Sequence, residues 1–154
     1  MNNHAIHSQA IITVGNELMG DDGVGPAIYR ALSRYNLPDT IQLIDGGTGG
    51  MSILHMLRGY EHVIIVDCGD FGGSPGEIAL FTPDDVVSLK SQTYSLHDVD
   101  LITLLEISKR LGEIPDTVHI IAIQPRRIAF NCPLSPEVAA AVPGAVACVL
   151  ALIQ

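Results

Sequence analysis

Positive charge, long apolar runs and paired cysteines are all scarce in this sequence of 154 residues. Lysine and arginine number 8 against 17 aspartates and glutamates, and the resulting net charge of −9 argues against a nucleic-acid partner. No apolar run approaches the roughly 20 residues of a membrane span, so we expect no membrane insertion. The cysteines, Cys68, Cys132 and Cys148, are widely separated and form no Cys-x-x-Cys motif for zinc or redox chemistry. Reduced thiols in a cytoplasmic protein are the simplest interpretation.

The first residues also lack a recognisable targeting pattern. Residues 1–9 are polar and contain no basic region followed by an apolar one, so we expect a disordered N-terminal tail rather than a secretory signal. Apolar residues make up 47% of the chain and charged residues only 16%, a composition that favours a large core. We therefore expect residues 10–154 to form a single α/β domain.

An acidic loop near the start of the chain is the first candidate functional feature. The β-branched run at 11–14 predicts a buried strand, and an amphipathic helix is expected to follow, which together make the first half of a parallel βαβ unit. The loop between them carries Glu17, Asp21 and Asp22 but neither the Lys-Ser/Thr ending of a P-loop nor a complete dinucleotide glycine pattern. Three carboxylates would repel phosphate and suit a metal ion, a proton transfer or a cationic group. Asp21 and Asp22 could alternatively cap the helix, whereas Glu17 lies too early to do so.

The remaining sequence predicts further strands and helices in alternation. Strands are expected at 41–44, 63–66, 77–81 and 118–123, with 77–81 as a candidate antiparallel edge strand. Helices are expected at 51–57, from the capping box Ser95-Leu96-His97-Asp98 to Gly112, and from Ser135 onward. The last helix is apolar on nearly all sides, which predicts burial, and Pro143-Gly144 is expected to kink or break it.

Three side chains are predicted to meet where the strands end. Asp67 follows a buried strand, Glu17 lies in the loop after the first strand, and His97 falls in the first turn of a helix, where a neutral imidazole is favoured. Two carboxylates and one imidazole form a site suited to a divalent transition metal. Taken singly, Asp67 could be a turn residue and His97 a surface histidine. The segment Asp45-Gly46-Gly47-Thr48 follows another strand and is interpreted as a wall against which a peptide can lie, with a simple turn as the alternative.

These motifs, in this order, resemble the hydrogenase maturation endopeptidases. The matching segments extend over nearly the whole chain and comprise residues 14–25, Asp45-Gly46-Gly47-Thr48, Val66-Asp67 with 73–76, Ser95-Leu96-His97-Asp98, and Gln124-Pro125 with 134–136. One departure is Cys68, at a position where a small residue such as alanine is expected.

The resemblance implies both a fold and an activity. The fold is a three-layer αβα sandwich with a mostly parallel twisted sheet of about five strands and helices on both faces, similar to flavodoxin-like and phosphorylase/hydrolase-like folds. The activity is endoproteolytic removal of the C-terminal extension from the precursor of a [NiFe] hydrogenase large subunit, after nickel insertion.

The resemblance also implies the residues of the site. Glu17, Asp67 and His97 would be the catalytic and metal-binding residues and would recognise nickel carried by the substrate, while Asp45, Gly46, Gly47 and Thr48 would bind the substrate peptide. Their individual catalytic roles stay open, as does whether the metal or a carboxylate activates water. We expect a monomer with no tightly held cofactor of its own.

Three other functions remain as alternatives from the sequence. A flavin- or nucleotide-binding module could use the same fold, although the acidic first loop argues against it. A cysteine peptidase could use Cys68 with His97, although no cationic neighbour in the sequence would lower the thiol pKa. A non-catalytic nickel chaperone would bind the same client without shortening it.

Overall fold

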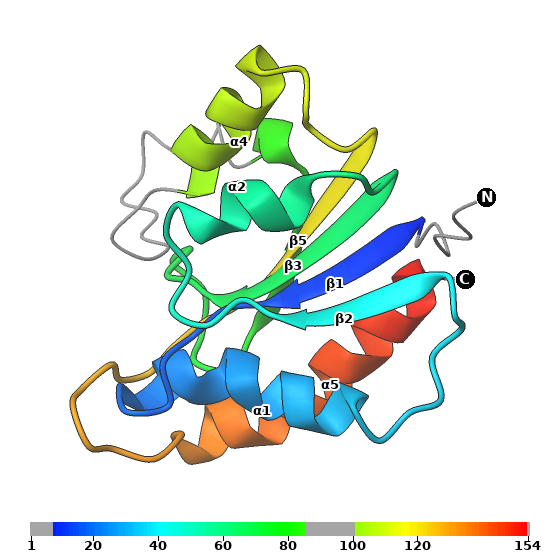
Figure 1. Cartoon of the computed structure of the whole chain (residues 1–154). Helices are drawn as coiled ribbons and strands as arrows, with labels where there is room; N and C mark the ends of the chain where they lie inside the picture. Colours follow the sequence, from blue (N-terminus) through cyan, green and yellow to red (C-terminus); the bar gives the residue numbers. More distant parts are fainter. Residues whose placement is uncertain (1–7, 86–100, 154) are drawn as a thin grey trace.

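The computed structural model describes residues 8–85 and 101–153 and is built around one five-stranded sheet (Figure 1). The strands are β1 (Gln9–Thr13), β2 (Ile41–Asp45), β3 (His62–Cys68), β4 (Ile78–Phe81) and β5 (Thr117–Ile123), in the order β2-β1-β3-β5-β4. All neighbouring pairs are parallel except β4 and β5, which are antiparallel. The predicted mixed sheet, including its antiparallel edge strand, is therefore confirmed.

Helices cover both faces of this sheet. They are the 3-10 turn η1 (Gly20–Gly23), α1 (Val24–Leu32), α2 (Ser52–Leu57), α4 (Leu101–Arg110) and α5 (Pro136–Leu152). In Figure 1, α1 and α5 lie below the sheet and α2 and α4 lie above it. The three-layer αβα architecture is thus confirmed, and no helix in the described ranges is long and apolar enough to cross a membrane.

The apolar strands lack alternation of apolar and polar residues because each strand contributes side chains to two separate hydrophobic cores, one on each face of the sheet. Ile12 of β1 belongs to the core under α2 and α4, which contains Leu57, whereas its neighbour Ile11 belongs to the core over α1 and α5 with Ile28 and Val149. All five side chains are fully buried. A strand covered on both faces has no side for polar residues, which explains the lack of apolar–polar alternation.

The structure of the two ends of the chain contradicts two sequence-based expectations. The backbone oxygen of Ser8 accepts hydrogen bonds from Glu61 and His62, and β1 begins at Gln9, so the predicted N-terminal tail is too long by at least Ser8 and Gln9. At the other end, α5 is continuous through Pro143, so the predicted break is wrong. Pro143 lies on the exposed side of α5, where water can satisfy the carbonyl that its ring leaves without an N–H partner.

The last helix is also only half buried. Its inner face is formed by Val138, Ala141, Ala145, Val146 and Val149, and its outer face by exposed small residues: Ala139, Ala140, Pro143, Gly144, Ala147 and Ala151. The helix belongs to an outer layer and has only one face toward the sheet, while alanine side chains on the other face expose little apolar area. The prediction of burial on all sides is therefore wrong.

Candidate active site

The loops that leave the carboxyl ends of the parallel strands form one continuous edge, at the left of Figure 1. Backbone hydrogen bonds tie the segment after β1 to its neighbours: Val14 N–H donates to the oxygen of Val66 in β3 at 2.9 Å, and Gly15 N–H donates to the oxygen of Gly47 in the loop after β2 at 2.8 Å. This is the edge at which open α/β sheets bind their ligands. The structure therefore brings the segments after β1, β2 and β3 together, as the sequence predicts.

Asp67 is buried at this edge of the sheet. It is the penultimate residue of β3, pairs in register with Ala122 of β5, and is only 3% exposed. The strand continues to Cys68, so Asp67 lies inside the strand rather than immediately after it. A carboxylate so deeply placed at a ligand-binding edge is a strong candidate for a chemical role.

The pKa of the neighbouring Cys68 thiol is affected by the carboxylates that surround it. Burial raises the pKa of Cys68, and the carboxylates of Asp67, Asp22, Asp21 and Asp70 raise it further. The pKa lies far above neutrality, so the thiol stays protonated and cannot serve as a thiolate nucleophile. Burial and the nearby carboxylates therefore argue against the cysteine peptidase alternative.

Glu17 reaches the same edge but is solvent-accessible. It follows β1 by four residues, and its side chain forms an ion pair with Arg30 of α1, in which both side chains are about 60% exposed. The third predicted ligand, His97, lies outside the described residues. Within residues 8–85 and 101–153, no group of three His, Cys, Asp or Glu side chains could hold a metal ion. The pairing of β1 with β3 thus brings Glu17 and Asp67 to one edge, and the meeting of all three side chains stays a prediction.

The glycine segment after β2 has a clear packing role. Gly46 N–H donates to the Thr13 oxygen at 2.7 Å, and a Cβ at Gly46 would lie 2.7 Å from that oxygen, so no other residue fits. Asp45 Oδ1 accepts the Gly47 N–H at 2.9 Å and closes the turn. Gly47 and Thr48 are exposed on the edge, and a Cβ on Gly47 would meet nothing within 4 Å. The surface that these two residues present beside the loop of Glu17 is open, and peptide binding there stays a prediction.

Asp21 has a structural role that the sequence did not reveal. It is completely buried, and its Oδ2 accepts hydrogen bonds from Arg126 N–H and Arg127 N–H at 2.8 Å and from Ser135 Oγ at 3.0 Å. Its Oδ1 accepts the Ser135 N–H at 2.6 Å. Burial by itself would raise the pKa of Asp21, but these hydrogen bonds outweigh burial and lower the pKa.

The side chains of the two aspartates in the first loop bind backbone N–H groups of loop residues. Asp22 Oδ2 accepts the Asn16 N–H at 3.0 Å, which fixes the loop after β1, while Asp21 fixes the distant loop between β5 and α5. The partners of Asp21 are 105 to 114 residues away in sequence, so no local pattern could have identified them.

Gln124 gives the loop after β3 a similar anchor. It is 7% exposed, its Oε1 accepts the N–H groups of Phe71 and Gly73 at 3.0 and 3.1 Å, and its Nε2 donates to Asp70 at 3.0 Å. Buried polar side chains therefore link the loops after β1, β3 and β5.

Comparison with known proteins places this arrangement in a family. Residues 26–152 match the family model described as hydrogenase maturation protease. The chain is 31% identical to the hydrogenase 2 maturation protease of Escherichia coli over 146 residues, which cover 94% of this chain and 89% of that protein. It is 32% identical to a putative hydrogenase maturation protease of Methanocaldococcus jannaschii over 151 residues, covering 94% and 95% of the two chains.

Solved structures agree with this result. The hydrogenase maturating endopeptidase HybD from E. coli superimposes with a TM-score of 0.84 at 30% identity, covering 94% of this chain and 91% of that one. The hydrogenase 2 maturation peptidase of a Thaumarchaeota archaeon gives a TM-score of 0.72 at 36% identity, covering 95% and 97%. The sequence match, the shared fold and the acidic edge lead to one conclusion: the chain is an endopeptidase of the hydrogenase maturation protease family.

Proposed function

We propose that the chain removes the C-terminal extension from the precursor of a [NiFe] hydrogenase large subunit after nickel insertion, and that it recognises the nickel carried by this substrate. The observation that carries the proposal is the position of Asp67, a buried carboxylate on the ligand-binding edge beside the loop of Glu17. Membership of the family supports the type of reaction.

The donor atoms suit the proposed recognition. Carboxylate oxygens of Glu17 and Asp67, together with the imidazole of His97, would complete the coordination of a borderline divalent ion that the client already holds. Glu17 is exposed enough to reach an ion on another protein, once its side chain leaves Arg30. This surface ion pair is weak in water, so releasing it costs little.

The same contact would orient the scissile peptide. With the substrate nickel held by these side chains, the peptide would lie along Asp45-Gly46-Gly47-Thr48, whose exposed glycine allows close approach of another backbone. A carboxylate of the site, or the substrate nickel, would then activate water for attack on the peptide carbonyl. The chain would act as a monomer in this scheme.

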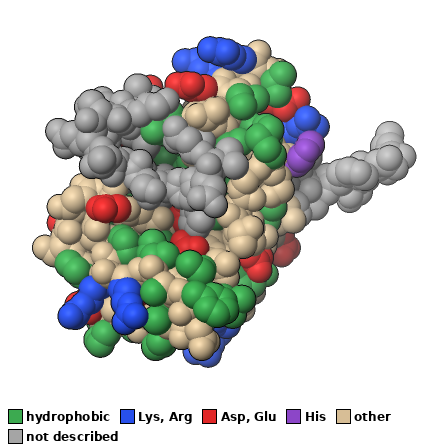
Figure 2. Space-filling model, turned by 90° about the vertical axis from the view of Figure 1, so that its left-hand side faces the viewer, with side chains coloured by type: hydrophobic (Ala, Val, Ile, Leu, Met, Phe, Trp, Pro, Cys, Tyr) green, Lys and Arg blue, Asp and Glu red, His purple; other side chains and the backbone are tan. Residues whose placement is uncertain are grey.

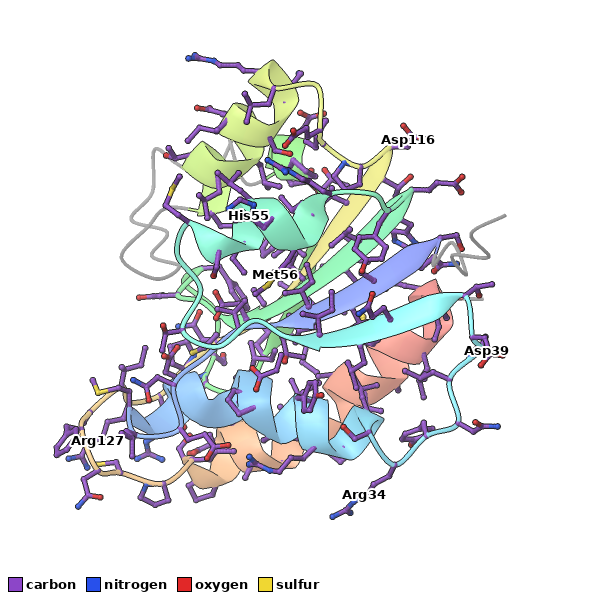
Figure 3. All side chains as sticks on the ribbon, viewed as in Figure 1. Arg34, Asp39, His55, Met56, Asp116 and Arg127 are labelled. Atoms are coloured by element: carbon purple, nitrogen blue, oxygen red, sulfur yellow. The ribbon has the colours of Figure 1, made fainter. Side chains whose placement is uncertain are left out.

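The decisive measurement is the mass of the precursor after incubation with the protein, with and without nickel. The wild-type protein is expected to shorten the nickel-loaded precursor and to leave the nickel-free precursor intact. Asp67→Asn and His97→Ala are each expected to reduce cleavage by at least about 100-fold. Asp116→Asn is the matched control, because Asp116 is exposed at the opposite end of the sheet (Figure 3).

Two results would contradict the proposal. Full activity of both site variants would remove Asp67 and His97 from the mechanism. A precursor that binds the wild-type protein but keeps its mass would instead favour the nickel chaperone.

A further inference from the structure

An exposed apolar patch lies next to the candidate active site. Leu18, Ile128 and Phe130, which we call the rim patch, are 59%, 53% and 73% exposed. Leu18 follows Glu17 directly, and its backbone oxygen accepts the Asn131 N–H at 2.7 Å, so the loops that carry the patch lie side by side. Figure 2, which views the molecule from this edge, shows hydrophobic side chains gathered on the lower half of the face with basic side chains at their margin.

The loop that carries Ile128 and Phe130 is held in place from beneath. Ile128 and Phe130 are exposed while Ala129 between them is half-buried, so alternate side chains point outward. Asp21 fixes the start of the loop through Arg126 N–H and Arg127 N–H. A buried carboxylate thus fixes a loop whose apolar side chains are exposed to water, and apolar side chains gathered on a surface indicate an interaction site.

Charge on the rim indicates the chemistry of that partner. The chain carries a net charge of −9, yet Arg126 and Arg127, a quarter of its 8 basic residues, adjoin the patch. Arg126 is paired with Glu137, whereas the exposed Arg127 side chain forms no ion pair with any residue in the described part of the chain. A partner that offers apolar side chains beside a carboxylate would complement both the patch and Arg127.

We propose that the rim patch and Arg127 form the docking surface for the hydrogenase large-subunit precursor. This inference rests on the proposed function. A client that docks here covers Leu18, the residue next to Glu17, and so brings its scissile segment to the acidic edge. The three apolar side chains make a small contact, which suits an enzyme that must release a large product.

The test compares steady-state cleavage of nickel-loaded precursor by rim variants and matched controls. Phe130→Ser is expected to raise KM about 10-fold with kcat within about twofold of wild type, because Phe130 contacts the client body and not the reacting atoms. Phe130→Leu should restore most of the affinity. Leu111→Ser is the control, since Leu111 is 58% exposed but lies just beyond α4.

Charge reversal gives a second, independent readout. Arg127→Glu is expected to raise KM several-fold and to weaken the dependence of kcat/KM on salt, whereas Arg34→Glu should change neither. Figure 3 shows that Arg127 lies on the rim and Arg34 beyond the end of α1, so the two reversals change net charge equally at separate places.

Each outcome bears on one idea. If the wild-type protein cleaves the precursor and the rim variants have unchanged KM, the docking surface is wrong and the proposed function stands. If the wild-type protein leaves the precursor intact, the proposed function fails, and equal dissociation constants of wild type and Phe130→Ser for the precursor would overturn the docking surface too.

A wild-type dimer in sedimentation that becomes a monomer in Phe130→Ser, with KM unchanged, would assign the patch to a second copy of the chain. Equal melting temperatures of the variants and wild type exclude misfolding as the cause.

Discussion

Replacing Asp21 by asparagine should destabilise the whole carboxyl-end edge, although the two side chains have nearly the same shape. The carboxylate accepts hydrogen bonds from Arg126 N–H, Arg127 N–H, Ser135 N–H and Ser135 Oγ and donates none. An amide must direct its NH₂ group at one of these sets of donors. In the better orientation it keeps the bonds to Oδ2 and loses the bond from Ser135 N–H.

The expected magnitude follows from these contacts. A hydrogen bond to a buried charged group contributes about 1.5–3 kcal/mol, and the remaining bonds weaken when the charge is removed. Asp21→Asn should therefore lower the free energy of unfolding by about 2–4 kcal/mol, which corresponds to about 5–15 °C in melting temperature. Asp45→Asn is the matched control, because Asp45 is exposed and accepts a single turn hydrogen bond that an asparagine oxygen can replace.

The effect should also depend on pH with a definite sign. The pKa of Asp21 is lowered in the folded protein, so its contribution is fully present above its ordinary value of 3.8 and is lost as pH falls below that value toward the folded-state pKa. The stability difference between wild type and Asp21→Asn should therefore shrink in strongly acidic solution. Urea unfolding at several pH values, with hydrogen exchange of residues 124–135, measures both effects. An Asp21→Asn protein as stable as Asp45→Asn, with unchanged exchange in that loop, would refute the reasoning.

Other predictions concern the thiol, a close backbone contact and a histidine pair. Cys68→Ala should keep precursor cleavage within about threefold of wild type, because burial and nearby carboxylates hold the thiol pKa too high for a nucleophile; loss of cleavage in the folded variant would restore the cysteine peptidase. Gly25→Ala should lower the free energy of unfolding, measured in urea, by more than about 3 kcal/mol, because a Cβ would lie 2.0 Å from a backbone oxygen. Gly59→Ala should lower it by about 1–2 kcal/mol, because the space around Gly59 is open but its φ is +83°. Burial, and to a lesser extent the neighbouring His119, lowers the pKa of His62. The stability of the folded protein should therefore fall as pH drops below 6.5. In His62→Phe, the melting temperature followed by circular dichroism should fall less over the same pH range.

The architecture could be predicted because its signals are local. Short β-branched runs without polar alternation identify strands covered on both faces, and alternation of such runs with amphipathic helices identifies parallel βαβ units. The sequence overestimated the burial of α5 because alanine counts as apolar wherever it lies. Pro143 was likewise judged without knowing that its side of the helix is exposed.

The sequence could predict the location of a site residue only where that location follows from the residue's position along a strand. Asp67 lies within one residue of the end of a buried strand, and parallel strands end at a common edge, so its approximate place followed from the sequence. The pairing of Glu17 with Arg30 and the anchoring of distant loops by Asp21 depend on contacts between remote segments. The exposure of Phe130 could not be foreseen either, because the chain around it has no periodic secondary structure.

The long sequence separation between Asp21 and its partners also bears on timing during synthesis. Because the acceptor is made early and its donors come 105 to 114 residues later, the outward-facing loop cannot be organised on a nascent chain that has not yet reached Ser135. A ribosome-bound fragment could pair its first strands yet have no ordered place to receive a client. The surface proposed to dock the precursor would thus become ordered only after Ser135 has emerged and bound Asp21.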